Sequence, residues 1–287
     1  MNQDAARRDS ATPAAVPLLD ASRDVGIRPI ASLAEFRACV DLQAEVWGPE
    51  YTDNVPASLL QVATYVGGIV LGAFTGDDEL VGFLFGLTGI DGKEIVHWSH
   101  LLGVRDVARN MGVGRLLKEA QRNELARRGV TRMSWTFDPL VAKNAYLNLN
   151  RLGARVVDYV PNMYGTTTSP LHYGIATDRL IVSVDTLASA PPRAAFAPNA
   201  SRPAVLTPAM QDDDVAPDRA APPDELWIEI PNDIRQVIER TPAAAVAWRE
   251  SVREHFLWAL AHGYEVKGLQ REPVTSRSFY LLRRVIP

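Results

Sequence analysis

The stretch from Leu101 to Gln121, LLGVRDVARNMGVGRLLKEAQ, constrains the fold of this chain more than any other segment. An apolar strand pattern runs into a turn that holds Gly112 and Gly114, and an amphipathic helix begins at this turn. A helix amino terminus carries backbone N–H groups without partners and a partial positive charge. Glycine lets an anion approach such a backbone without a Cβ in the way. The spacing therefore predicts an anion cradle, suited to a diphosphate, at the end of a buried strand. It is neither the GxGxxG dinucleotide fingerprint nor a P-loop.

Composition narrows the class of protein and of partner. The chain has 287 residues, of which 47% are hydrophobic and 22% charged, as in a globular protein with a core. A net charge of -4 excludes a chain-wide basic field, so we expect no nucleic-acid partner. No segment approaches the roughly 20 apolar residues of a membrane span. Cys39 is the only cysteine, which excludes an intrachain disulfide and a cysteine-cluster zinc site. We expect no metal, and a cytoplasmic location.

The texture of the sequence divides the chain into four parts. Residues 1–24 form a polar, alanine-rich tail, and residues 25–187 alternate apolar runs with amphipathic segments. Residues 188–223 are rich in Ala and Pro without periodicity, which predicts a linker. Residues 224–287 again have the alternation of apolar and amphipathic segments that is typical of a globular domain.

Residues 25–187 predict a mixed α/β sandwich around a central sheet, with antiparallel hairpins and a parallel strand–helix–strand unit. Ser32 and Glu35 form a capping box at the first helix, and the turns at 76–78 and 91–92 have hairpin chemistry. The expected elements are strands at 26–30, 69–76, 80–89, 94–104, 131–137, 154–160 and 179–185, and helices at 33–46, 56–64, 112–128 and 141–152.

The carboxy-terminal block predicts a strand–helix–strand–strand order. A strand at 226–231 precedes a helix that starts at Thr241-Pro242 and stops at Gly263, and strands follow at 264–269 and 278–282. The same order occurs over residues 131–185, so we hypothesise a degenerate half-copy without the phosphate loop. Arg249 and Arg253 share a helix face, where they could meet an acidic acceptor or pair with the neighbouring Glu250 or Glu254.

A family resemblance gives the glycine turn a specific meaning. Arg109-x-x-Gly112-x-Gly114 resembles the Q/R-x-x-G-x-G/A signature of the GNAT acyltransferases, and Leu102 and Val104 match the Leu-x-Val strand before it. Asn144-Ala145 and Leu152-Gly153-Ala154 are similar to the family's second signature. WSHLLGV and NAYLNLNRLGA resemble a subgroup of uncharacterised GNAT proteins with an extra carboxy-terminal part. The resemblance covers residues 26–186 and implies the GNAT fold.

The resemblance also implies a cofactor site for acetyl-CoA. The coenzyme A diphosphate would rest on the backbone amides from Asn110 through Met111, Gly112, Val113 and Gly114 to Arg115. The pantetheine arm would pair beside Leu102 and Val104, where the strand separates from its neighbour at a bulge, and Asn144 could bond the pantetheine amides or merely decorate its helix. From the residues alone, Arg115, Lys118 and Arg122 share one helix face, which either contacts phosphates or is solvated.

Catalysis would need a base, because an alkylamine is protonated at neutral pH. His100 lies two residues before Leu102, so in a regular strand both point to the same side, whereas His97 points the opposite way. His100 is therefore the candidate base, with a satisfied structural histidine as the alternative. Many GNAT enzymes carry a tyrosine as acid where this chain has Leu149; Tyr146 is the nearby catalytic candidate. Ser99 has no base at a recognisable spacing.

The resulting prediction is an N-acyltransferase that uses acetyl-CoA and a small-molecule or amino-acid amine, by direct attack in a ternary complex. Two alternatives stay open: a non-catalytic acyl-CoA-binding protein, and a transferase for a longer or acidic acyl group such as succinyl. The extra carboxy-terminal part could extend the sheet, cover the acceptor site or form a homodimer contact.

Overall fold

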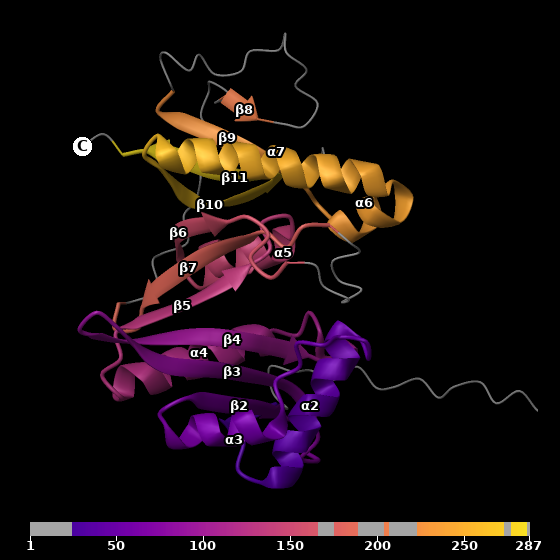
Figure 1. Cartoon of the computed structure of the whole chain (residues 1–287), viewed down its shortest axis with the longest axis vertical. Helices are drawn as coiled ribbons and strands as arrows, with labels where there is room; N and C mark the ends of the chain where they lie inside the picture. Colours follow the sequence, from indigo (N-terminus) through magenta and orange to yellow (C-terminus); the bar gives the residue numbers. More distant parts are fainter. Residues whose placement is uncertain (1–24, 166–174, 189–203, 207–222, 273–276, 286–287) are drawn as a thin grey trace, which may run out of the picture.

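The computed structural model describes residues 25–165, 175–188, 204–206, 223–272 and 277–285. Two sheets organise these residues (Figure 1). The expected tail and most of the expected linker lie outside the described residues.

The first sheet has seven strands in the order β1-β2-β3-β4-β5-β7-β6. Its first four strands form an antiparallel meander, β5 runs parallel to β4, and β7 is antiparallel to both β5 and β6. The mixed sheet predicted from the hairpin turns and the strand–helix–strand unit is confirmed. The strands are β1 (Gly26–Pro29), β2 (Ile69–Phe74), β3 (Leu80–Asp91), β4 (Glu94–Val104), β5 (Arg132–Phe137), β6 (Arg155–Val160) and β7 (Arg179–Asp185).

Helices cover both faces of this sheet. On one face, α2 (Leu33–Trp47) and α3 (Ala57–Tyr65) pack against a cluster that includes Phe83 and Phe85 of β3. On the other, α4 (Val113–Arg127) packs against a cluster that includes Leu84. We call these the α2 face and the α4 face. The short η1 (Asp106–Ala108) lies between β4 and α4. The predicted capping box is present, since Ser32 Oγ accepts from the Glu35 amide and the Glu35 carboxylate accepts from the Ser32 amide.

The helix predicted over 141–152 has two geometries. It begins as α5 (Ala142–Ala145) and continues as a π-helix, η2 (Tyr146–Arg151). A π-helical turn holds an additional residue, so side chains after it are rotated relative to an α-helix. Asn150 is thereby placed on the edge of β10, where its amide bonds the N–H and C=O of Leu269 at 2.9 and 3.1 Å.

The second sheet has four strands in the order β10-β11-β9-β8. The strands are β8 (Ala204–Leu206), β9 (Glu225–Pro231), β10 (Tyr264–Glu272) and β11 (Arg277–Arg284), and the helices beside them are α6 (Ile234–Arg240) and α7 (Pro242–Ala261). The strand–helix–strand–strand prediction is confirmed; α6 is an additional short helix, capped by the Asp233 side chain on the Arg235 amide.

The two sheets contain similar three-stranded units. The unit β5-β7-β6 has the first, third and second strands of its segment side by side, and so has β9-β11-β10. In each unit a glycine with positive φ, Gly153 or Gly263, precedes the second strand. In each, the pairing is irregular between the third and fifth residues after that glycine. The shared order and register support our proposal that residues 224–287 are a degenerate copy of residues 131–185.

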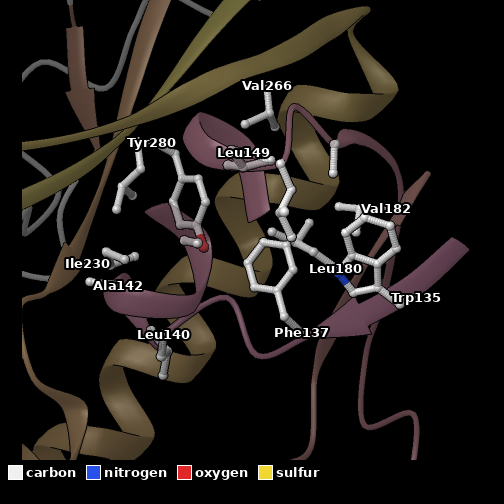
Figure 2. Packing of buried hydrophobic residues seen from close by; sticks show 14 of the residues in the cluster. Trp135, Phe137, Leu140, Ala142, Leu149, Leu180, Val182, Ile230, Val266 and Tyr280 are labelled. Atoms are coloured by element: carbon white, nitrogen blue, oxygen red, sulfur yellow. The ribbon is translucent and has the colours of Figure 1, made fainter. Parts of the chain in front are cut away.

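A common core joins the two units. Figure 2 shows Tyr280 and Val266 of the second sheet against Phe137 and Leu149 of the first unit. The Tyr280 hydroxyl donates to the carbonyl of Pro139 at 2.7 Å. The two sheets therefore share one hydrophobic core.

Ion pairs between the units correct one sequence interpretation. Arg249 donates two bonds to Asp138, at 2.9 and 2.7 Å, and Arg253 donates two to Asp178, at 2.8 and 2.7 Å. For Arg249 the prediction of an acceptor or of a neighbouring glutamate as partner is wrong, because α7 turns it onto the first unit. Arg253 binds Asp178 and is also attracted by the predicted neighbour Glu250. The Asp138-Pro139 turn thus carries a structural contact.

Candidate functional site

The turn before α4 leaves a run of backbone N–H groups without acceptors. Within the described ranges, the amides of residues 110–114 donate to no backbone or side-chain oxygen, whereas those of Arg115 and Leu116 bond the Gly112 carbonyl at 3.0 and 3.1 Å. No side chain caps the helix. Unpartnered amides and the positive end of the helix dipole together favour an anion. The turn has the geometry of the cradle predicted from the sequence, and we call it the amide cradle.

Gly112 opens the amide cradle. Its φ is +83°, a conformation that glycine adopts without the steric cost of a Cβ, and no atom lies within 4 Å of where a Cβ would stand. At Gly114 a Cβ would lie 3.4 Å from Leu102, so α4 lies close against β4. Val113 is buried and Met111 packs against the same core, which fixes the backbone of the turn.

The predicted basic residues near the amide cradle already have partners. Arg109 pairs with Asp106 at 2.6 Å, and its Nε donates to the carbonyl of Val104 at 3.3 Å, so it ties the turn to the end of β4. Arg115, half exposed, pairs with Glu119 at 3.0 Å. Arg109 therefore positions the turn, and Arg115 lies at its outer rim.

Lys143, at the start of α5, is a border residue of the amide cradle that sequence reasoning missed. Its amine donates to the side-chain oxygen of Asn110. Desolvation, with the charges of Arg109 and Arg235, lowers the pKa of Lys143. The signal that could have identified Lys143 was its place in the sequence, directly before the candidate residue Asn144.

The α5–η2 segment gives two asparagines, four residues apart, different surroundings. Asn144 is exposed, whereas Asn148 is buried and accepts from the Trp135 indole N–H at 3.0 Å. The π-helical turn between them accounts for the difference. Tyr146 is half-buried, with the Arg151 guanidinium 5.7 Å from its ring centroid. Among the described contacts, its hydroxyl makes no hydrogen bond. Asn144 and Tyr146 thus have free polar groups on the α4 face.

Strands β4 and β5 separate halfway along the sheet. They pair only where Val96–Trp98 meets Arg132–Ser134. Beyond this point β4 continues to Val104 and β5 to Phe137 without pairing, so the edge of β4 that carries Leu102 and Val104 has no partner strand. We call this opening the fork. It corresponds to the separated strands that the resemblance implies.

A bulge in β4 reverses the expected side of His100. Phe85 pairs with Leu101 and Gly86 with Ser99, so His100 is an additional residue on β4. An extra residue inverts the alternation of side chains. Leu102 packs on the α4 face, but the His100 ring lies edge-on to Phe85, at 6.0 Å between centroids, on the α2 face. The prediction that His100 and Leu102 share a side is therefore wrong, while His97 does lie opposite His100.

The two histidines have different surroundings. His97 is buried on the α4 face between Thr88 and Gln121, both at 2.9 Å, and desolvation lowers its pKa to about 4. His100 is solvent-accessible at the fork, and partial desolvation lowers its pKa below 6.5. Both rings are neutral at neutral pH, but His100 can reach a solvent-borne molecule and His97 cannot.

Lys118 and Arg122 have partners within the fold, so they do not form the solvated face that was one of the two sequence alternatives. Arg122 donates to the carbonyls of Asp185 and Thr186 at 3.0 and 3.3 Å, which caps the end of β7. Lys118 is buried, and its amine donates to Ser99 Oγ at 2.8 Å. Sequence reasoning gave Ser99 no partner, and the structure supplies a donor from the second turn of α4.

A cavity of about 40 Å³ adjoins Lys118, enough for two or three water molecules. It lies between α4, β5, β7 and the end of η2. Its lining residues are Lys118, Glu119, Arg122, Met133, Trp135, Arg151, Leu152 and Val184.

Two other kinds of site have no support in the described residues. They contain no cluster of three or more His, Cys, Asp or Glu side chains that could hold a metal ion. None of their helices combines the length and apolarity needed to cross a membrane.

Comparisons with known proteins give likeness of fold. No family model and no curated protein matches this sequence. Among solved structures, the Salmonella typhimurium protein yncA with acetyl-CoA is 19% identical, covers 60% of this chain and 99% of its own, and has a TM-score of 0.45. An aminoglycoside 6'-acetyltransferase type Ii is 22% identical, with 57% and 98% covered and a TM-score of 0.45. Arabidopsis thaliana NAA60 with acetyl-CoA is 14% identical, with 56% and 99% covered and a TM-score of 0.45.

Evidence for the fold comes from this chain's own topology. The mixed sheet, the separation of β4 from β5 on a bulged strand and the glycine turn before α4 are features that the sequence resemblance implies. The described residues thus have the mixed sheet of the GNAT acyltransferase fold, with an added carboxy-terminal β-α-β-β unit.

Proposed function

We propose that this chain is an acyl-CoA-dependent N-acyltransferase that uses acetyl-CoA and the amine of a small molecule or amino acid. The amide cradle is the observation that carries the proposal. Its run of free N–H groups at residues 110–114 suits a diphosphate, which presents several acceptor oxygens to the positive end of α4.

The fork supports a path for the rest of the donor. From the amide cradle, the pantetheine arm runs along the open edge of β4 past Val104 and Leu102 toward Ser99. This stretch of strand is about 17 Å long at 3.3–3.4 Å per residue. Backbone groups on the open edge bond the arm and the acyl oxygen, the latter in the manner of an oxyanion hole. Asn144 and Tyr146 border the arm from the α5–η2 side.

The bulge supports the chemistry of the acceptor. Because His100 lies on the α2 face, an amine that enters from that face meets the base on its own side of β4. A lowered pKa keeps His100 neutral at neutral pH and able to take the proton that the amine nitrogen loses as it attacks. The amine then attacks the thioester directly, in a ternary complex with the donor.

A pair of glycine variants tests donor binding. Gly112 and Gly129 both have positive φ, +83° and +74°, at opposite ends of α4, and at neither would a Cβ meet an atom within 4 Å. Gly112→Ala and Gly129→Ala therefore carry a similar backbone penalty, about 1–2 kcal/mol each. We expect Gly112→Ala to weaken acetyl-CoA binding at least tenfold in calorimetry and Gly129→Ala to leave it unchanged. Equal affinities in both variants would contradict the proposed donor site.

Turnover tests the enzymatic part of the proposal. Release of free thiol from acetyl-CoA is measured against a panel of small amines, amino acids and peptides. An amine-dependent release supports a transferase. Tight acetyl-CoA binding without release from any amine would instead indicate a non-catalytic acyl-CoA-binding protein. Succinyl-CoA in the same screen decides between a neutral and an acidic acyl group.

A further inference from the structure

Lys118 occupies an unusual position for a cation. It is 6% exposed, and its amine contacts Ser99 Oγ at 2.8 Å on β4 and lies 4.1 Å from the centroid of the Trp135 ring on β5. Within the described ranges no carboxylate forms an ion pair with it. Burying an ammonium without a counter-ion is costly, so Lys118 is a candidate for a role beyond packing.

The position of Lys118 coincides with the closed end of the fork. Trp98 and Ser134 are the last paired residues of β4 and β5, and the contacts of Lys118 are with the next residue on each strand. The amine thus bridges the two strands where they separate. It lies on the α4 face, as Leu102 does, whereas His100 lies on the α2 face.

The resemblance leaves the departing thiolate without an acid. Leu149 stands at the position of the usual tyrosine, and its side chain is buried in the core. Tyr146 precedes it on η2 and does not line the cavity beside Lys118. The open edge of β4 leads from the amide cradle to Lys118, so the donor's sulfur would arrive close to this amine.

We propose that Lys118 is a further catalytic residue, which donates a proton to the coenzyme A thiolate as the acyl group is transferred. The inference rests on the proposed function. The amine nitrogen forms a bond to the carbonyl carbon, and His100 takes the proton that the nitrogen loses. The C–S bond breaks with its electron pair on sulfur, and the sulfur takes a proton from the Lys118 ammonium. Solvent then returns a proton to Lys118 and removes one from His100.

The surroundings of Lys118 suit proton donation. Desolvation lowers its pKa well below 10.5, so the Lys118 ammonium gives up its proton more readily than an exposed lysine does. The aromatic ring of Trp135 favours the cationic form. His97, the nearest titratable group on β4, has a pKa of about 4 and stays neutral. The groups that face Lys118 are Ser99 and His97 from β4, Trp135 from β5, Arg151 from η2, and Glu119 and Arg122 from α4.

Base and acid would then lie on opposite faces of β4. At the bulge, Ser99 contacts Lys118 on the α4 face, whereas the next residue, His100, lies on the α2 face. An amine can therefore approach the acyl carbon from the α2 face while the thiolate is protonated on the α4 face. The two proton transfers need not compete for one site.

Lys118→Met tests the assignment, because methionine is apolar and of similar length and fits a buried site. We expect its kcat to fall about 100-fold or more, with acetyl-CoA affinity changed less than threefold. The basic limb of the pH–rate profile should disappear as well. Lys93→Met, an exposed lysine in the β3–β4 turn, is the matched control and should behave as wild type. Tyr146→Phe tests the rival acid, and its loss of kcat should be smaller than that of Lys118→Met.

A second variant keeps the test independent of packing. In Lys118→Ala, added alkylammonium ions should restore part of the turnover, and the restored rate should vary with the pKa of the added amine. A purely structural role would show no such dependence.

Three outcomes would overturn the assignment. Lys118→Met could keep wild-type kcat and pH profile, Tyr146→Phe could show the large loss in its place, or Lys118→Ala could show no rescue. Absence of thiol release by the wild type with every amine is a different result, since it refutes the proposed function itself.

Discussion

The pair of Asp138 and Arg249 holds the carboxy-terminal unit on the first, and its removal gives a prediction that can be worked from the geometry. Their side chains are 13% and 2% exposed and share bonds of 2.9 and 2.7 Å. Breaking a buried pair from one side costs about 3–5 kcal/mol, because the remaining charge loses its partner. Most of that cost is the burial of an uncompensated ion.

The two single variants should differ. In Asp138→Asn, Arg249 loses both carboxylate bonds while its Nε has no partner already, so we expect the full 3–5 kcal/mol, roughly. In Arg249→Met, Asp138 keeps Arg179 at 3.7 Å and the amide of Leu140 at 2.8 Å. The expected loss is then about 2 kcal/mol. The double variant, without either charge, should lie closer to wild type than Asp138→Asn does.

Low pH should remove the difference in free energy of unfolding between wild type and Asp138→Asn. The charges of Arg249 and Arg179 and the bonds to the carboxylate hold the pKa of Asp138 below its ordinary 3.8 in the folded chain, against the opposing effect of burial. A lowered folded-state pKa gives stability that is present above the unfolded pKa and is lost as the pH falls through the folded pKa. The advantage of wild type should be constant above about pH 5 and shrink below pH 3.8.

Urea unfolding at several pH values measures these free energies. Arg283→Met is the control, since Arg283 pairs with Glu225 on the same sheet at 63% and 32% exposure and should contribute at most about 1 kcal/mol. If Asp138→Asn is no more destabilising than Arg283→Met, the pair behaves as a solvated one and the reasoning from burial is refuted.

Two further predictions concern the base and the first helix. His100→Gln should lower turnover at neutral pH about 100-fold or more and abolish the acid limb that the lowered pKa of His100 places below pH 6.5; a pH–rate profile with a wild-type acid limb would exclude His100 as the base. Ser32→Ala removes one side of the capping box of α2 and should lower the free energy of unfolding by about 1 kcal/mol in thermal or urea unfolding. Acetyl-CoA binding should not change. A loss below a few tenths of a kcal/mol would show that the cap contributes little.

Periodicity and turn chemistry predicted most of the fold. The first helix and the hairpins lie where the capping box and the glycine–aspartate turns placed them. The glycines at 112 and 114 also located the amide cradle, because backbone geometry at a helix start depends on few residues. Local signals of this kind need no knowledge of distant contacts.

The side of His100 could not be derived from a regular alternation. A bulge adds a single residue to one strand. Every later side chain of that strand then lies on the opposite side from the one that regular alternation predicts. One signal was available in the sequence. Leu101 and Leu102 are adjacent apolar residues, and in a regular strand adjacent side chains point to opposite faces of the sheet. Such a pair indicates either a two-sided strand or a bulge, and only the pairing with β3 decides between them.

Lys118 was missed because its charge received more weight than its position. It follows Gly114 by four residues and precedes Leu125 by seven, so it also shares the face of the helix that these two residues occupy. The identity of its partner Ser99 depends on how α4 lies across β4, which involves residues 19 positions apart. Spacing can place such a lysine on a buried face, but only the tertiary structure can give it a partner.

The long helix of the carboxy-terminal unit starts differently from α4, the helix that precedes the first unit. α4 begins after Gly112 with unpartnered amides, whereas α7 begins with Pro242, which has no N–H and fixes φ for the first turn. The second unit therefore has no amide cradle of this kind. Its strand β10 instead bonds Asn150, within the π-helical turn that carries Tyr146. We infer that the second unit serves to fix η2 beside the fork, so that changes at Leu269 or Asn150 would alter the donor site without touching it.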